Sequence, residues 1–175
     1  MNEYFTNTLK KYEKLNHFVL KGQLLFFGST FLEEFPLEEL KQDFALDRVI
    51  YNRSIQGLTV DEALNILDTC VFELMPSKLF ISLGDEDEQM PNYSKKDFFE
   101  KYALLLDKVY TELPACKIYI LTPEYNFALK TLAKEKHAFY IDLSASAESD
   151  YVSAFRRMKT FFRDGNIAFS EAWNA

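Results

Sequence analysis

Hydroxyl and carboxylate side chains follow two glycines at points where this chain could do chemistry. Ser29 and Thr30 come directly after Gly28, and four consecutive acidic residues follow Gly84. A threonine hydroxyl can act as a nucleophile when a neighbouring base takes its proton. Backbone N–H groups of a turn that leads into a helix can bind an anion. Together these residue types could supply a nucleophile, a proton acceptor and an anion-binding turn.

Short apolar runs that alternate with longer amphipathic runs must position these residues. The apolar runs are nearly continuous, as is typical of parallel strands covered on both faces. We expect strands at Leu24–Phe27, Arg48–Tyr51, Lys78–Leu83, Lys117–Leu121 and Ala138–Asp142. The alternation predicts a single domain over residues 1–175, a three-layer α/β/α fold with a doubly wound five-stranded parallel sheet.

Helices are expected between the strands. Thr59 to Glu62 has the pattern of a capping box, and Ser94 with Asp97 is a second start signal. The acidic run Asp85–Glu88 is expected to be a loop. The residues expected on inward helix faces are Phe5, Leu9, Tyr12, Ala63, Leu64, Leu67, Val71, Phe98, Tyr102, Leu105, Leu106 and Val109, and further helices are expected at 127–134 and 151–162.

Three glycines fall at one edge of the predicted sheet. Gly28, Gly57 and Gly84 each follow a strand, and ligands of such folds bind beyond the carboxyl ends of the strands. Each glycine taken singly could equally serve only to allow a tight turn. Their shared position nevertheless predicts that the candidate site lies at this edge.

Four sequence blocks, in order, resemble those of the SGNH/GDSL hydrolases, esterases and lipases on a flavodoxin-like sheet. The resemblance extends from Gln23 to about Trp173, which is most of the chain. The blocks are Gly28-Ser29-Thr30, Asn52-Arg53-Ser54-Ile55-Gln56-Gly57, Gly84-Asp85-Glu86-Asp87 and Asp164-Gly165-Asn166-Ile167. If the chain is active, the resemblance implies a carboxylic ester hydrolase that needs no cofactor and no metal.

The resemblance also shows what has been replaced in the catalytic triad. Thr30 occupies the position of the nucleophilic serine, and Ser29 that of the preceding aspartate. Asp164 remains, but Ile167 stands where the family has its histidine base. Isoleucine cannot accept a proton, and loss of a triad member leaves only about 10³–10⁴-fold catalysis over water.

The oxyanion hole is altered as well. The resemblance implies that Gly57 keeps its backbone donor, whereas Glu86 replaces the asparagine whose amide would donate to the oxyanion. Loss of one such donor typically costs about 10²–10³-fold in rate. Glu86 goes further, because it brings a carboxylate to the place where negative charge would develop.

Two histidines could in principle supply the missing base. His17 precedes the first predicted strand and His137 the last, so both are expected at the opposite edge of the sheet. Five strand residues span about 16 Å, which puts both imidazoles out of reach of Thr30. A shifted turn could make Ser29 the nucleophile, but Ser29 would lack a base too.

Three functional hypotheses follow. The leading one is a noncatalytic protein, a pseudoenzyme that uses the old pocket or another surface to bind a ligand or a protein. The second is an esterase or acylhydrolase of weak or unusual activity that uses Thr30 or Ser29. The third is an acidic cation-binding module built from Asp85, Glu86 and Asp87, although the run lacks the spacing of an EF-hand.

Composition narrows the choice of partners. The 175 residues are 48% hydrophobic and carry a formal net charge of −7, which disfavours nonspecific nucleic-acid binding. No apolar run is long enough to span a membrane, and the polar N-terminus is not that of a signal peptide. Cys70 and Cys116 lie in or beside apolar segments, so we expect reduced core cysteines in a cytoplasmic protein.

Overall fold

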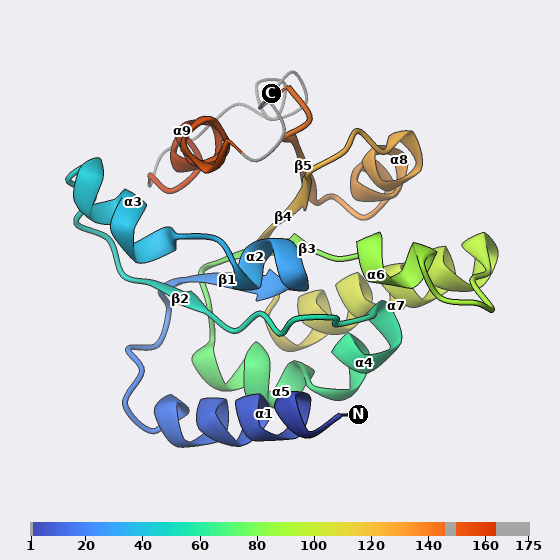
Figure 1. Ribbon diagram of the computed structural model, residues 1–175, viewed down its shortest axis with the longest axis horizontal. Helices are drawn as coiled ribbons and strands as arrows, with labels where there is room; N and C mark the ends of the chain where they lie inside the picture. Colours follow the sequence, from blue (N-terminus) through green and yellow to red (C-terminus); the bar gives the residue numbers. More distant parts are fainter. Residues whose placement is uncertain (1, 146–149, 164–175) are drawn as a thin grey trace.

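The sheet of the computed structural model has five parallel strands in the order β2-β1-β3-β4-β5 (Figure 1). The structure describes residues 2–145 and 150–163. Its strands are β1 Leu24–Gly28, β2 Ile50–Asn52, β3 Lys78–Ser82, β4 Lys117–Thr122 and β5 Phe139–Asp142. This order is the flavodoxin-like, doubly wound arrangement, so the predicted fold class is confirmed.

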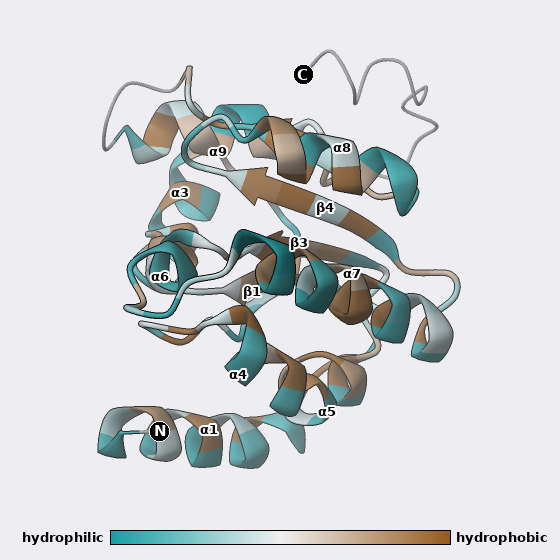
Figure 2. Ribbon diagram, turned by 90° about the vertical axis from the view of Figure 1, so that its right-hand side faces the viewer, coloured by the Kyte–Doolittle hydropathy of each residue, from teal (hydrophilic) through white to brown (hydrophobic). Residues whose placement is uncertain are grey.

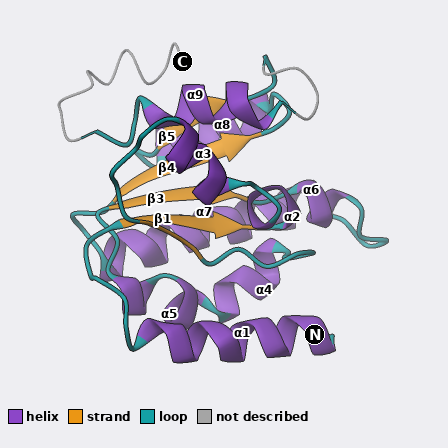
Figure 3. Cartoon of the chain, turned by 60° about the vertical axis from the view of Figure 1, so that its left-hand side comes forward, coloured by secondary structure: helices purple, strands orange, loops and turns teal. Residues whose placement is uncertain are grey.

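Helices cover both faces of the sheet (Figure 3). One face carries α1 (Glu3–Asn16), α4 (Val60–Asn65), α5 (Leu67–Cys70), α7 (Lys95–Glu112) and α8 (Phe127–Glu135). The other carries α2 (Thr30–Glu33), α3 (Leu37–Asp43) and α9 (Tyr151–Lys159). Strand side chains alternate between the two resulting cores, because successive residues of a strand point to opposite faces. Figure 2 shows β4, hydrophobic over most of its length, between α7 and α8.

The predicted helix signals are present in the structure. The Thr59 side chain accepts from the backbone N–H of Glu62, and the Glu62 side chain accepts from that of Thr59, which completes the capping box of α4. The Ser94 side chain accepts from the N–H of Asp97 at the start of α7. All five α7 residues expected to face inward are buried. Local side-chain chemistry therefore fixes where these two helices begin.

Four predicted elements differ from the observed ones by more than one residue. One of them, the helix expected at 151–162, ends at Lys159. The second strand begins at Ile50 rather than Arg48, because pairing with β1 starts where Ile50 lies opposite Leu24. The helix after Thr59 breaks at Ile66 into α4 and α5, followed by a 3₁₀ turn, η1 (Phe72–Leu74). The acidic run is not a loop but a short helix, α6 (Asp85–Glu88). Carboxylates are favoured in the first turn of a helix because they interact with its positive end.

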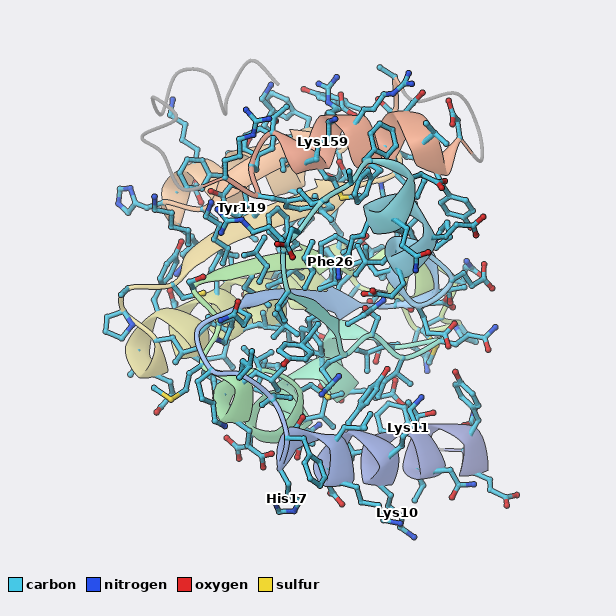
Figure 4. All side chains as sticks on the ribbon, turned by 90° about the vertical axis from the view of Figure 1, so that its left-hand side faces the viewer. Lys10, Lys11, His17, Phe26, Tyr119 and Lys159 are labelled. Atoms are coloured by element: carbon cyan, nitrogen blue, oxygen red, sulfur yellow. The ribbon has the colours of Figure 1, made fainter. Side chains whose placement is uncertain are left out.

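The amino-terminal edge of the sheet holds both histidines. His17 follows α1 and is exposed, as Figure 4 shows, and the exposed His137 precedes β5. Cys70 and Cys116 are free and buried, and burial raises the pKa of each thiol to about 12. Among the described residues, no helix combines the length and apolar character needed to cross a membrane.

Candidate functional site

Three segments that are distant in the sequence meet at the carboxyl edge of the sheet. The Thr30 hydroxyl donates to Oε1 of Glu86 over 2.6 Å. The backbone N–H of Gly57 donates to Oγ1 of Thr30 over 3.2 Å. The helices that carry Thr30 and Glu86, α2 and α6, lie side by side in Figures 1 and 3. The structure therefore brings together three of the residues that the sequence singled out.

The position of Thr30 follows from a close approach between β1 and β3. Gly28, the last residue of β1, lies opposite Ser82, and the N–H of Ser29 donates to the Ser82 carbonyl over 3.0 Å. A Cβ atom on Gly28 would lie 2.2 Å from the Ser82 carbonyl oxygen. Only glycine lets the two backbones come this close. The following residue, Thr30, is therefore held at the strand end as the first residue of α2.

The segment that carries Gly57 is tied to the same turn by hydrogen bonds. Backbone N–H groups of Arg53 and Ile55 donate to the carbonyls of Phe26, over 2.8 Å, and Gly28, over 3.0 Å. The Asn52 amide donates to the carbonyl of Leu32 in α2 over 2.7 Å. The sequence predicts no separate role for Asn52 beyond its membership of the second block. Its polar side chain at the end of a strand was the available signal for this positioning contact.

The three acidic residues proposed as a cation site point to different partners. Glu86 contacts Thr30, whereas the Asp87 carboxylate accepts from the N–H of Val60 over 3.1 Å. Asp85 lines a separate hollow between α6 and α8. Successive helical residues are turned by about 100° from one another, so a helical run cannot converge on one ion. No group of three potential metal-binding side chains occurs within residues 2–145 and 150–163.

Burial alters the protonation of two carboxyl groups beside Glu86. It raises the pKa of Asp87 to about 6, against the opposing effect of the hydrogen bond from Val60. Burial also raises the pKa of Asp85, and the nearby charges of Glu88 and Glu124 raise it further. Both carboxyl groups therefore give up their protons less readily than a carboxyl group in water.

The raised pKa of Asp87 predicts a specific pH dependence of stability. An acid whose pKa is higher in the folded state stabilises the fold below its unfolded pKa, here 3.8, and loses that contribution as pH rises through about 6. An Asp87→Asn variant keeps an oxygen that can accept from Val60 but does not titrate. As the pH rises from roughly 4 to 7, the free energy of unfolding of this variant should increase by about 1 kcal/mol relative to that of the wild type, after allowance for solvent screening.

Urea unfolding of both proteins across this pH range measures the difference. Asp68→Asn, at an exposed position of α5, is the control and should track the wild type at every pH. If the free energy of unfolding of Asp87→Asn changes with pH in parallel with that of the wild type, the raised pKa of Asp87 is wrong.

This fold is similar to those of several solved structures. A Streptococcus pneumonia protein, provisionally described as a platelet activating factor, superposes with a TM-score of 0.78 at 19% identity, over 92% of this chain and 94% of its own. A GDSL-like lipase from Bacteroides thetaiotaomicron gives 0.62 at 16% identity, over 82% of each chain. The lipase/acylhydrolase from Enterococcus faecalis gives 0.58 at 18% identity, over 71% of this chain and 77% of its own.

The chain has the SGNH/GDSL hydrolase fold. Identities this low establish the fold and nothing finer. No family model matches the sequence, and no curated protein matches it either. Function must therefore be argued from the site itself.

In this SGNH fold, the hydroxyl of Thr30 is accessible and that of Ser29 is not. Ser29 is 5% exposed, and its hydroxyl has no hydrogen-bond partner within the described part of the chain. Thr30 is partly exposed and contacts both Gly57 and Glu86. A buried hydroxyl cannot reach an ester, so the geometry disfavours Ser29 as a nucleophile.

The final block of the SGNH resemblance, with Asp164 and Ile167, lies outside the described residues. The described chain ends at Arg163, whose carbonyl accepts from Nζ of Lys78 over 2.5 Å. Lys78 is the first residue of β3, at the opposite end of the strand from Ser82 and the Thr30 turn. Neither described histidine lies at the carboxyl edge, so the described part of the site contains no imidazole base.

Proposed function

We propose that this protein has lost ester hydrolysis and uses its SGNH fold to bind a ligand or another protein. The observation that carries the proposal is the 2.6 Å hydrogen bond from the Thr30 hydroxyl to the Glu86 carboxylate. In an active hydrolase, the nucleophile gives its proton to a base, and separate donors receive the oxyanion. Here one carboxylate accepts the hydrogen bond of the hydroxyl and stands in the place of a donor.

The electrostatics of this pair oppose acyl transfer. A carboxylate accepts hydrogen bonds and has none to donate, so Glu86 would repel the negative charge that develops on the carbonyl oxygen. The Gly57 N–H remains a donor, but its bond to Oγ1 of Thr30 is directed at the hydroxyl. Loss of the base and of one donor together removes the two largest contributions to catalysis in such a site.

A second candidate function is an esterase in which Glu86 itself is the base. The same short hydrogen bond favours it, because a nucleophile and its base must lie within about 2.6–3.2 Å. Glu86 would take the Thr30 proton as the hydroxyl oxygen attacks the ester carbon, and later return it to the leaving alcohol. Against it stands the position of Glu86, which cannot serve as base and also leave the oxyanion hole free.

Hydrolysis of a short p-nitrophenyl ester separates the two candidates. We expect the wild type to be no faster than Thr30→Ala or Glu86→Gln, and a fluorophosphonate probe to leave the protein unlabelled because no base activates the hydroxyl. A wild-type rate above both variants, with stoichiometric labelling at Thr30, would instead identify a Thr30–Glu86 esterase.

A further inference from the structure

A groove of about 480 Å³ begins beside Gly57 and runs between α4 and the start of α7. Its apolar lining comes from Met90, Pro91, Tyr93 and Phe98. The rings of Tyr93 and Phe98 pack at 6.0 Å, and Met90 is 54% exposed. We call this feature the α4–α7 groove. An exposed methionine beside aromatic rings is an adaptable surface of the kind that partner side chains fill.

The rim of the α4–α7 groove carries an excess of negative charge. The rim has one lysine, Lys101, and four carboxylates, which are those of Asp61, Glu62, Asp87 and Asp97. Nζ of Lys101 lies 2.8 Å from Asp61 and 3.1 Å from Asp97, so its charge is already matched by two carboxylates. The remaining carboxylates, Glu62 and Asp87, accept from backbone N–H groups of Thr59 and Val60. Backbone donors carry no net charge, so the rim stays negative.

The hollow on the other side of α6 strengthens this potential. Its lining includes Asp85, Glu88 and Glu124 and, among the residues that the structure describes, no lysine or arginine. Like charges held this close to one another attract cations from solution and repel anions. A phosphate backbone, an anionic lipid headgroup or a free fatty acid would be repelled at this edge.

We propose that the α4–α7 groove docks a basic segment of a partner protein. An apolar side chain of that segment packs against Met90, Tyr93 and Phe98, and lysines or arginines on either side of it face the carboxylate rim. A polypeptide fits better than a small amine, because the carboxylates are spread around a groove that also has an apolar floor. The inference rests on the proposed binding role and names the chemistry of the partner.

Fluorescence anisotropy with a labelled nine-residue peptide of alternating lysine and leucine tests the groove. We expect saturable binding at about 0.05 M salt that weakens steeply as salt rises, since exposed charges are screened. A peptide with glutamate in place of lysine should not bind, and one with serine in place of leucine should bind more weakly. Equal binding of the acidic peptide, or displacement by an equal concentration of spermine, would overturn the proposal.

Matched variants locate the binding surface. Asp61→Asn with Asp97→Asn should weaken binding about tenfold, because it removes two rim charges. The control Glu39→Gln with Asp43→Asn makes the same change at exposed positions of α3, on the other face of the sheet, and should bind like the wild type. Met90→Ser tests the apolar floor and should weaken binding several-fold. Because Met90 is exposed, this change should leave the stability of the protein unaltered.

Equal losses in the groove and control variants, or no loss in either groove variant, would refute this surface. The peptide-binding results and the hydrolysis assay test separate claims. A protein that binds no basic peptide but also hydrolyses no ester would overturn this inference and leave the loss of hydrolysis intact.

Discussion

Ester hydrolysis should rise at least about 10²-fold over the wild-type rate when Thr30→Ser, Glu86→Asn and Ile167→His are combined. The family blocks assign these three positions to the nucleophile, the oxyanion-hole amide and the base. Glu86→Asn replaces an acceptor with a donor beside the hydroxyl, and the Gly57 N–H supplies a second donor. An imidazole at position 167, oriented by Asp164, would take the proton of the new serine.

The three single changes should each do little, because groups that act as a unit are strongly non-additive. Thr30→Ser alone has no histidine base, and Ile167→His alone leaves Glu86 where the oxyanion forms. Initial rates on a short acyl ester, compared among the singles, the triple and the wild type, measure the effect. A folded triple variant no faster than the wild type would show that the pocket has lost its catalytic geometry, and would favour binding at another surface.

Gly28→Ala should unfold the protein or lower its free energy of unfolding by at least about 3 kcal/mol. The new Cβ would lie 2.2 Å from the Ser82 carbonyl oxygen and 3.0 Å from its carbon, both backbone atoms. Neither strand can move away, because Gly28 is in register with Ser82 and the N–H of Ser29 bonds to the same carbonyl. A loss of this size is a large share of the total stability of a typical domain.

Gly22→Ala is the matched control for this prediction. Gly22 has a φ of +78°, but a Cβ there meets no atom within 4 Å. Only the backbone strain of a left-handed alanine remains, and it should cost about 1 kcal/mol. Urea unfolding curves of both variants provide the comparison, and equal losses at the two glycines would contradict the proposed close contact of β1 with β3.

Sequence alone was sufficient for the elements whose signals are local. Nearly continuous apolar runs identified all five strands, because a strand covered on both faces needs apolar residues at every position. Thr59 and Ser94 identified the starts of two helices, because a capping side chain bonds to backbone groups only a few residues away. The blocks around Gly28, Gly57 and Gly84 then indicated the edge of the sheet at which Thr30, Gly57 and Glu86 meet.

Features that depend on pairing across the chain were harder to predict. The second strand is shorter than its apolar run suggests, because its limits are set by which residues lie opposite β1. The acidic run was expected to be a loop, and its helix follows Gly84, where a side chain would press against Phe98 of α7. The limits of β2 and this close contact with Phe98 both depend on residues that are distant in the sequence.

The sequence by itself determined the fold class and the residue types available at the site. Only the tertiary structure decided what those residues do to one another. It joined Thr30, Gly57 and Glu86 by hydrogen bonds, turned Asp85 and Asp87 away from Glu86, and buried the hydroxyl of Ser29. Composition and spacing report which groups are present. Contacts of 2.6 and 3.2 Å between residues 56 and 27 positions apart are set by the packing of the whole sheet.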